Sequence, residues 1–301
     1  MRHGRGRRGR HARHKRRSLQ GDPWPARKGG SRRRRLPVAT QASDFPGATR
    51  ATLPASHRYT QEFPFHKEGK MKIGIIGAGQ IGGTLTRRFR ALGYEVFVAN
   101  SRGPASLAAL AAETGAKAVT AKEAARSGEV VVVTIPEAKI RDLPKDLFAG
   151  VPQTVVVVDT GNYYPRQRDG RIEEIESGMT ESRWVSRQLG RPVVKAFNNI
   201  YARHLMERGL PAGSAGRIAL PVAGDDPEAK AIVLGLIDEL GFDGVDAGGL
   251  DESWRQQPAT PVYGTDFDAE GVRQALAQAS PERKPEWKAT AKSPGDFARP
   301  A

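Results

Sequence analysis

The residues with the clearest chemical meaning are three glycines in the spacing G-x-G-x-x-G, directly after the apolar run Lys72–Ile76. The first glycine permits a tight turn from strand to helix, the second lets the backbone approach a pyrophosphate, and the third allows close packing of helix on strand. Phosphates at this position would meet the free N–H groups and the positive dipole end of the helix. The predicted dinucleotide-binding loop consists of Gly77, Ala78, Gly79, Gln80, Ile81 and Gly82.

The end of the next predicted strand, Glu95–Ala99, indicates which dinucleotide is bound. NAD enzymes usually place an Asp or Glu there for the ribose 2′-hydroxyl. This chain has Asn100, Ser101 and Arg102 instead. A carboxylate would repel a 2′-phosphate, whereas a serine donates a hydrogen bond and an arginine a charge-assisted one. We therefore predict NADP(H) as the cofactor.

These residues need a fold that brings strand ends together, and the chain alternates apolar strand-like runs with helical segments. We predict an α/β fold of the Rossmann type, with a doubly wound, mostly parallel sheet and a short C-terminal extension, because strands buried on both faces are continuous Val/Ile runs. The expected strands are 72–76, 95–99, 117–119, 129–135, 154–158, 192–197, 218–222 and 242–245. The expected helices are 80–92, 105–114, 121–127, 202–208, 227–240 and 269–279.

In such a sheet, ligands bind beyond the carboxyl ends of the strands. Thr134, Ile135 and Pro136 follow one strand and are predicted to border the cofactor. Asp159 ends the next strand, where it either orients substrate or holds a turn. Asn198 and Asn199 follow a third, where they either bind a nicotinamide or flavin-like edge or cap the following helix.

The sequence offers few other catalytic groups. It has no cysteine, and five of its six histidines lie in the first 70 residues, so we expect no metal site. We interpret the sixth, His204, as a surface or packing residue. Lys195 either contacts phosphate or pairs with Asp159.

Charge divides the chain into unequal parts. Residues 1–70 hold 19 of the 48 Lys and Arg and 4 of the 33 Asp and Glu, which leaves 29 of each for the remainder. The net charge of +15 therefore belongs to the tail, and we predict no nucleic-acid partner for the neutral body. We assign 1–70 as a disordered Arg-rich tail, 71–250 as the NADP-binding domain and 251–301 as an extension with one helix and a mobile end.

Three interpretations of the tail compete: a non-specific nucleic-acid-binding arm, a targeting peptide, and an upstream extension that is not translated. The last is favoured, because Lys67-Glu68-Gly69-Lys70 can be encoded by a ribosome-binding sequence just before Met71, which would then be the true start. No apolar run reaches the ~18 residues of a membrane span, so we expect a cytoplasmic protein without membrane contact.

The glycine loop, Ser101-Arg102, Ile135-Pro136 and the segment Pro221–Asp226 together resemble the deazaflavin (coenzyme F420)-dependent NADP reductases. The resemblance extends to the wider superfamily that shares its N-terminal domain with pyrroline-5-carboxylate reductases. The run Val193–Ile200 lacks the histidine-bearing segment of the deazaflavin family and is more similar to the cytosolic reductase domain of six-transmembrane metalloreductases.

The resemblance implies hydride transfer between NADP and a deazaflavin or flavin. Such transfer requires proximity and alignment more than an acid–base set. Two alternatives stay open: an NADPH-dependent reductase of a small metabolite, and a non-catalytic NADPH-sensing protein. A homodimer is the candidate assembly.

Overall fold

The computed structural model describes residues 70–293, 295 and 296, which belong to one compact unit spanning Gln61–Ala301. The predictions of an Arg-rich disordered tail and of a nucleic-acid-binding arm fall on residues outside this described part. Within the described part, no helix is both long enough and apolar enough to cross a membrane.

The first β-α-β unit follows from its apolar pattern. Strand β1 (Lys72–Ile76) is buried beyond its first residue, helix α1 (Gln80–Ala91) begins after the glycine loop, and β2 (Glu95–Ala99) lies parallel to β1. Gly93, at a φ of +85°, makes the left-handed turn that ends the helix, a conformation that costs other residues energy.

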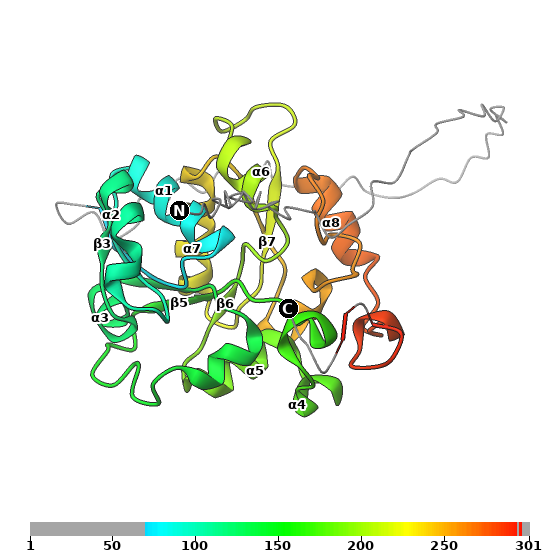
Figure 1. The fold of residues 1–301 in the computed structure, drawn as a ribbon. Coiled ribbons are helices and arrows are strands. Elements are labelled where there is room, and N and C mark those ends of the chain that lie inside the picture. Colours follow the sequence, from blue (N-terminus) through cyan, green and yellow to red (C-terminus); the bar gives the residue numbers. More distant parts are fainter. Residues whose placement is uncertain (1–69, 294, 297–301) are drawn as a thin grey trace, which may run out of the picture. The chain divides into compact units, whose positions relative to one another are not determined.

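Six parallel strands form the main sheet, in the order β3-β2-β1-β4-β5-β6. Figure 1 labels β3, β5 and β6 among them. The order reverses between β1 and β4, which is the switch point where ligands bind in doubly wound folds. The predicted fold class is thereby confirmed. The remaining strands of this sheet are β3 (Lys117–Ala118), β4 (Val130–Val133), β5 (Val156–Asp159) and β6 (Val194–Lys195).

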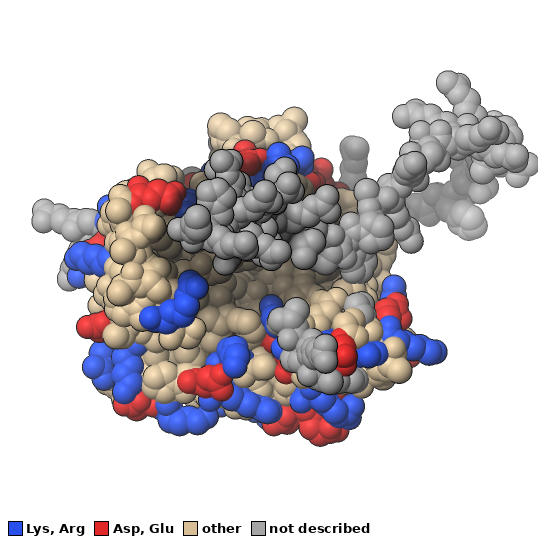
Figure 2. Space-filling model, viewed as in Figure 1, with Lys and Arg blue, Asp and Glu red and all other residues tan. Residues whose placement is uncertain are grey.

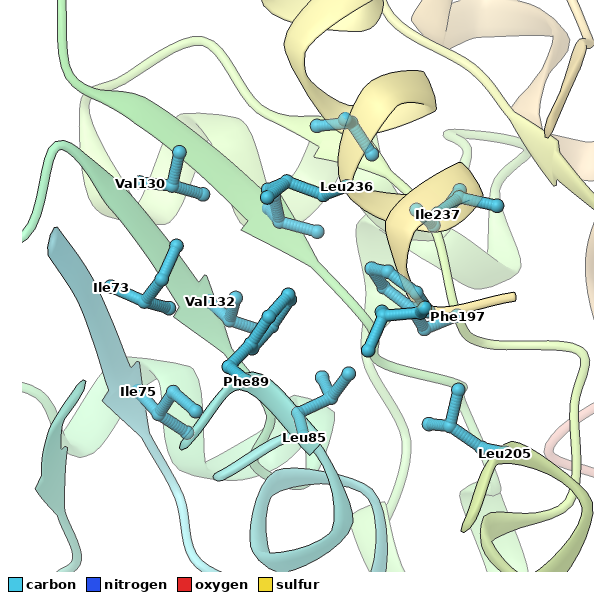
Figure 3. Close-up of a cluster of buried hydrophobic side chains, with 14 of the residues drawn as sticks. Ile73, Ile75, Leu85, Phe89, Val130, Val132, Phe197, Leu205, Leu236 and Ile237 are labelled. Carbon is cyan, nitrogen blue, oxygen red and sulfur yellow. The ribbon is translucent and has the colours of Figure 1, made fainter. Parts of the chain in front are cut away.

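Helices cover both faces of this sheet. Ile73 and Ile75 of β1 point into one hydrophobic cluster with α1 and α7 (Pro227–Glu239), which Figure 3 shows in close-up. Ile76 belongs to a second cluster with α3 (Ala121–Ser127) and α5 (Glu181–Leu189). Alternate side chains of β1 thus enter two hydrophobic clusters, one on each face of the sheet, as a doubly covered sheet requires. A short helix, α2 (Ala108–Thr114), follows the 3₁₀ turn Pro104–Leu107.

Two later strands form their own small sheet. Strand β7 (Ala219–Val222) pairs in parallel with β8 (Asp243–Asp246), and a single antiparallel bridge between Lys195 and Ala223 joins β7 to the edge of the main sheet. The sequence predicts both strands as members of the main, mostly parallel sheet. Helix α8 (Ala269–Ala277) packs on this two-stranded sheet through Val272, Ala275 and Leu276.

Strand β6 is shorter than predicted. The sequence predicts a strand over 192–197, but regular pairing covers Val194 and Lys195, and Phe197 adopts a φ of +61°. This left-handed conformation is unfavourable for a bulky residue and turns the chain out of the sheet. The buried Phe197 ring, which packs in the first cluster, holds the turn in place (Figure 3).

The chain between β5 and β6 contains structure that the apolar pattern did not predict. A single π-helical turn, Pro165–Asp169, is followed by α4 (Glu173–Glu176) and α5. Helix α6 (Ala202–Glu207) follows β6 and ends one residue earlier than predicted. Two further 3₁₀ turns, Leu250–Gln256 and Pro285–Trp287, lie in the C-terminal part.

The C-terminal segment packs against the body over residues 283–289, whereas the sequence analysis predicts a mobile end for the extension. Trp287 is 8% exposed, and its ring centroid lies 6.1 Å from that of Tyr164. The backbone N–H of Ala289 donates to Glu176 at 2.9 Å, and the Arg283 guanidinium donates to Glu181. These contacts join residues 283–289 to the α4–α5 region.

Candidate functional site

The glycine loop has no room for side chains at two of its positions. Gly77 has a φ of +113°, and a Cβ there would lie 2.2 Å from the carbonyl oxygen of Thr134. A Cβ at Gly82 would lie 1.9 Å from the carbonyl oxygen of Gly77. Both distances are far inside van der Waals contact, so the loop keeps this shape only with glycine at both positions.

Gly79 has the opposite environment. A Cβ at Gly79 would meet no atom within 4 Å, so this part of the loop faces open space. Gly79 caps the 12-residue helix α1 without a side-chain hydrogen bond, and the first turn of α1 contains no acidic residue. The backbone N–H groups of that turn can therefore bind an anion. The open cradle and the uncapped helix end fit a pyrophosphate, whereas Ala78 and Ile81 pack against the core.

The end of β2 supplies a free cation next to this loop. The Asn100 side chain accepts from the backbone N–H of Arg102 at 2.9 Å and thereby shapes the turn. Ser101 and Arg102 are exposed, and within the described residues the Arg102 guanidinium has no hydrogen-bond or ion-pair partner. The loop contains no carboxylate between Asn100 and Ser106, so this end of the strand fits a 2′-phosphate better than a free ribose.

The end of β4 lies directly on the glycine loop. The N–H of Thr134 donates to Ile76 at 2.9 Å, and Ile135 Cγ2 would lie 2.7 Å from a Cβ at Gly77. Thr134, Ile135 and Pro136 are each partly exposed. The structure therefore brings the two predicted cofactor segments into contact at the switch point of the sheet.

Asp159, at the end of β5, is occupied by protein partners. Its carboxylate accepts from the N–H of Gly161 at 2.8 Å and from Ser182 Oγ at 2.6 Å, and Lys195 Nζ lies 3.3 Å away. Lys195 also donates to the carbonyl oxygen of Gly161 at 2.6 Å. Asp159 is 1% exposed and Lys195 is fully buried, so they hold the ends of β5 and β6 together rather than contact a substrate.

Two buried acids that the sequence analysis did not single out complete this cluster. Glu181 accepts from Arg283 and lies 4.0 Å from Lys195 Nζ. Glu137 is fully buried, and neither of its carboxyl oxygens has a hydrogen-bond partner within the described residues. A Cβ placed at Gly161 would lie 2.5 Å from Glu137 Oε1. The sequence contains one signal that could have identified Glu137, because this glutamate directly follows Ile135-Pro136 at the end of a buried strand.

Charge balance favours the protonated form of Glu137. Asp159 and Glu181 offset the charges of Lys195 and Arg283, so Glu137 is an excess acid. Burial raises the pKa of Glu137 well above its ordinary value, and the neighbouring Asp159 raises it further. Burial alone would lower the pKa of Lys195, but the surrounding carboxylates raise it. Both effects on Glu137 favour its protonated form, which would leave the cluster neutral overall.

The two candidate asparagines differ. The Asn198 amide is saturated, because it donates to Asn162 at 3.0 Å and to the carbonyl oxygen of Gln256 at 2.7 Å and accepts from the Gln256 side chain at 2.9 Å. Asn199 is 2% exposed, and neither its amide nitrogen nor its amide oxygen has a partner within the described residues. A buried amide without partners is costly, which leaves Asn199 as the stronger ligand candidate of the two.

His204 lies away from the strand ends. Its Nδ1 lies 2.7 Å from Asp266, and its ring meets that of Tyr201 edge to face. Within the described residues, no group of three or more metal-ligating side chains is placed to hold a metal ion.

The face shown in Figure 2 is hollowed where Figure 1 places β5 and β6, and the visible wall of the hollow is mostly uncharged. A mostly uncharged hollow suits an organic ligand.

Comparison with known proteins adds three observations. Residues 72–163 match the family model described as NADP oxidoreductase coenzyme F420-dependent. The protein YjhV of Escherichia coli strain K12 is 47% identical over 70 residues, which make up 23% of this chain and 51% of YjhV. The chain thus matches about half the length of this curated relative.

The crystal structure of a hypothetical protein, SMa0349, from Sinorhizobium meliloti is 32% identical, with a TM-score of 0.55, over 66% of this chain and 95% of SMa0349. A structure of a candidate F420-dependent NADP reductase from Arthrobacter sp. FB24 is 25% identical, with a TM-score of 0.49, over 60% of this chain and 86% of that one.

Proposed function

We propose that this chain transfers hydride between NADP and a flavin-like or deazaflavin ring. The proposal starts from the premise that the chain belongs to the NADP oxidoreductase family whose model matches residues 72–163. The chain is an NADP-dependent oxidoreductase, and the ring acceptor is the step that we add. One observation carries the choice of cofactor. Within the described residues Arg102 has no hydrogen-bond or ion-pair partner and no carboxylate follows it in its loop, and the glycine loop is open and uncapped, which supports a 2′-phosphate at Arg102.

Each part of the dinucleotide has residues that would hold it. The loop Gly77–Gly82 and the first turn of α1 would bind the pyrophosphate, and Ser101 with Arg102 would bind the 2′-phosphate. Thr134, Ile135 and Pro136, which are each partly exposed, would border the nicotinamide. When bound, the nicotinamide supplies the hydride.

The buried acid–base groups favour a ring acceptor over a small carbonyl or imine metabolite. Glu137, Asp159 and Lys195 stand closest to the strand ends, and each is at most 1% exposed. None of them can touch a substrate in this conformation. Hydride transfer to a conjugated ring places its main demand on proximity and alignment, which a mostly uncharged hollow can provide.

The experiment is a turnover assay with the full 301-residue chain. NADPH oxidation is followed at 340 nm with a deazaflavin, FMN or FAD as acceptor, and NADPH binding is measured separately by fluorescence. We expect turnover with at least one ring acceptor and weaker binding of NADH than of NADPH. Turnover with carbonyl or imine compounds alone would favour the metabolite reductase, and tight NADPH binding without any turnover would favour the sensor.

Two further expectations belong to this proposal. A cysteine-free oxidoreductase that uses NADPH fits the cytoplasm, where NADPH is available. A homodimer is expected, and sedimentation of the full chain would test it.

A further inference from the structure

A cavity of about 330 Å³ lies in the C-terminal part of the chain. Residues between 254 and 261, around the end of the 3₁₀ turn Leu250–Gln256, form one wall, and residues between 278 and 284, which follow α8, form the other. Its volume falls at the lower end of the range for small-molecule sites, about 300–1,000 Å³. Both walls lie outside residues 72–163, so the family match assigns no role to this cavity.

The first wall is apolar and stiff. Trp254, Pro258 and Pro261 line it, and the Arg255 guanidinium carbon lies 4.4 Å from a ring centre of Trp254, which holds that side chain. Proline fixes its own backbone angle, so this wall loses little freedom when a ligand binds. Ala259, also in this wall, has a φ of +73°, a conformation that residues with a side chain rarely adopt. The wall thus offers a preformed surface to a flat apolar group.

The second wall carries hydrogen-bond donors. Lys284 is exposed, and within the described residues its ammonium group has no partner. The Ser280 hydroxyl accepts from the backbone N–H of Glu282 at 3.3 Å, which leaves its own hydrogen unused. The bonds from Arg283 to Glu181, Gln257 and the Trp287 carbonyl oxygen use three of the five N–H groups of its guanidinium.

A buried amide beside these donors lacks an acceptor. Gln257 lines the cavity and is 8% exposed. Its Oε1 accepts from Arg283 at 3.2 Å, whereas its Nε2 has no hydrogen-bond partner within the described residues. Unpaired buried donors are costly and commonly mark the place of a water molecule or a ligand. The polar side of the cavity is therefore short of acceptor atoms.

The charges of the lining select the sign of the ligand. Arg283 and Lys284 are cations and Glu282 is the one carboxylate among the lining residues, which gives a net charge of 2 − 1 = +1. A carboxylate has only acceptor atoms, and it forms its strongest hydrogen bonds with charged donors. A cationic ligand would face two cations and a set of donors that it cannot use.

We propose that this cavity is a second ligand site of the protein, which binds a small organic carboxylate with a flat apolar body. The body lies against Trp254 and the prolines, and the carboxylate accepts from Lys284 and Ser280. The site is separate from the predicted dinucleotide site, and it stands or falls independently of the proposed function.

The first experiment uses three probes with the full chain. Isothermal titration calorimetry measures the Kd of 2-naphthoate, of its uncharged analogue 2-naphthamide, and of acetate, which has the charge without the ring. We expect 2-naphthoate to bind at least about 10-fold more tightly than either of the others, because it alone uses both walls. Saturating NADP⁺ should leave the Kd of 2-naphthoate within two-fold.

The second experiment uses variants at exposed positions of the cavity. Lys284→Gln removes the exposed cation and should weaken 2-naphthoate about 5-fold while leaving 2-naphthamide unchanged. Ser280→Trp fills the cavity and should abolish binding of both aromatic probes. The matched control is Lys292→Gln, an exposed lysine of the same segment that does not line the cavity, and it should bind 2-naphthoate as wild type does. Melting temperatures within about 2 °C of wild type show that the variants are folded.

The outcomes decide the proposal without a turnover assay. A preference for 2-naphthoate that is lost in Ser280→Trp and reduced in Lys284→Gln supports it. It is overturned by equal affinity for 2-naphthoate and 2-naphthamide, by a change of less than two-fold in Lys284→Gln, or by no 2-naphthoate binding up to about 5 mM. Displacement of 2-naphthoate by NADP⁺ would assign the probe to the dinucleotide site and would also overturn it. Turnover of a ring acceptor, or its absence, bears on the proposed function alone.

Discussion

Replacing Glu137 by glutamine should stabilise the protein at neutral pH, although it changes a fully buried residue. Glu137 is the excess acid in a cluster where Asp159 and Glu181 already offset Lys195 and Arg283. Its pKa in the folded state is raised well above 4.5, first by burial and then by Asp159. In the unfolded chain the same carboxyl ionises near 4.5. Folding at pH 7 therefore requires this carboxyl group to take up a proton, because it is ionised in the unfolded chain.

The sign and size of the effect follow from linkage. A raised folded pKa gives stability that is fully present below 4.5 and is lost as pH rises towards the folded pKa. The loss is about 1.4 kcal/mol for each pH unit, so the interval from 4.5 to 7 sets a ceiling of about 3 kcal/mol. Glutamine has the shape of the protonated acid and no proton to lose. We expect Glu137→Gln to raise the free energy of unfolding by about 1–3 kcal/mol at pH 7 and to leave it nearly unchanged at pH 4.5.

Urea unfolding at pH 4.5, 5.5, 6.5 and 7.5 measures this difference, with the fluorescence of the buried Trp184 as the signal. The matched control is Glu174→Gln, whose carboxylate is 45% exposed and pairs with Arg141 at 3.3 Å; it should change stability by at most about 0.5 kcal/mol at every pH. A Glu137→Gln variant that is less stable than wild type at pH 7.5, or that shows the same pH dependence as wild type, would refute the assignment of Glu137 as the protonated member.

Three further changes test other parts of the site. Arg102→Ala should weaken NADPH binding by about 1.5–3 kcal/mol and NADH binding much less, by fluorescence titration, and equal losses would contradict the 2′-phosphate assignment. Gly79→Val should leave the melting temperature unchanged, because no atom lies within 4 Å of its Cβ, yet weaken NADPH binding more than about 10-fold; normal binding would place the pyrophosphate elsewhere. Lys195→Met should lower the free energy of unfolding by about 3–5 kcal/mol, because Asp159 stays buried without its cation, and a loss under 1 kcal/mol in urea would show that the pair is dispensable.

The parts of the fold that depend on local pattern were predictable. Val130–Val133 and Val156–Val158 are continuous β-branched runs, so their burial on both faces could be inferred without tertiary information. The glycine loop has a spacing that is tied to one local geometry, and its position after β1 needed no knowledge of distant residues. The ends of β1 and β2 and the start of α1 follow from such signals.

The parts that depend on distant partners were not predictable. The shortness of β6 results from the φ of Phe197, which its buried ring imposes through packing with α1 and α7. Asn198 and Asn199 look equivalent in sequence, but Gln256, 58 residues away from Asn198, saturates one of them and not the other. The partner of Glu181 comes from position 283, which no spacing rule connects to it.

The ion pair between Glu181 and Arg283 also bears on the order in which the protein is made. Synthesis proceeds from the N-terminus, and domains begin to fold while the chain is still being extended. Glu181 can enter the interior about 100 residues before its arginine has been synthesised, at 5–20 residues per second. Until position 283 is made, Lys195 is the cation available to both Asp159 and Glu181, which lie 3.3 and 4.0 Å from it in the folded structure, and Arg283 completes the charge balance afterwards. Ribosome-bound chains that stop before position 283 should therefore be more sensitive to protease around α5 than chains that have passed it.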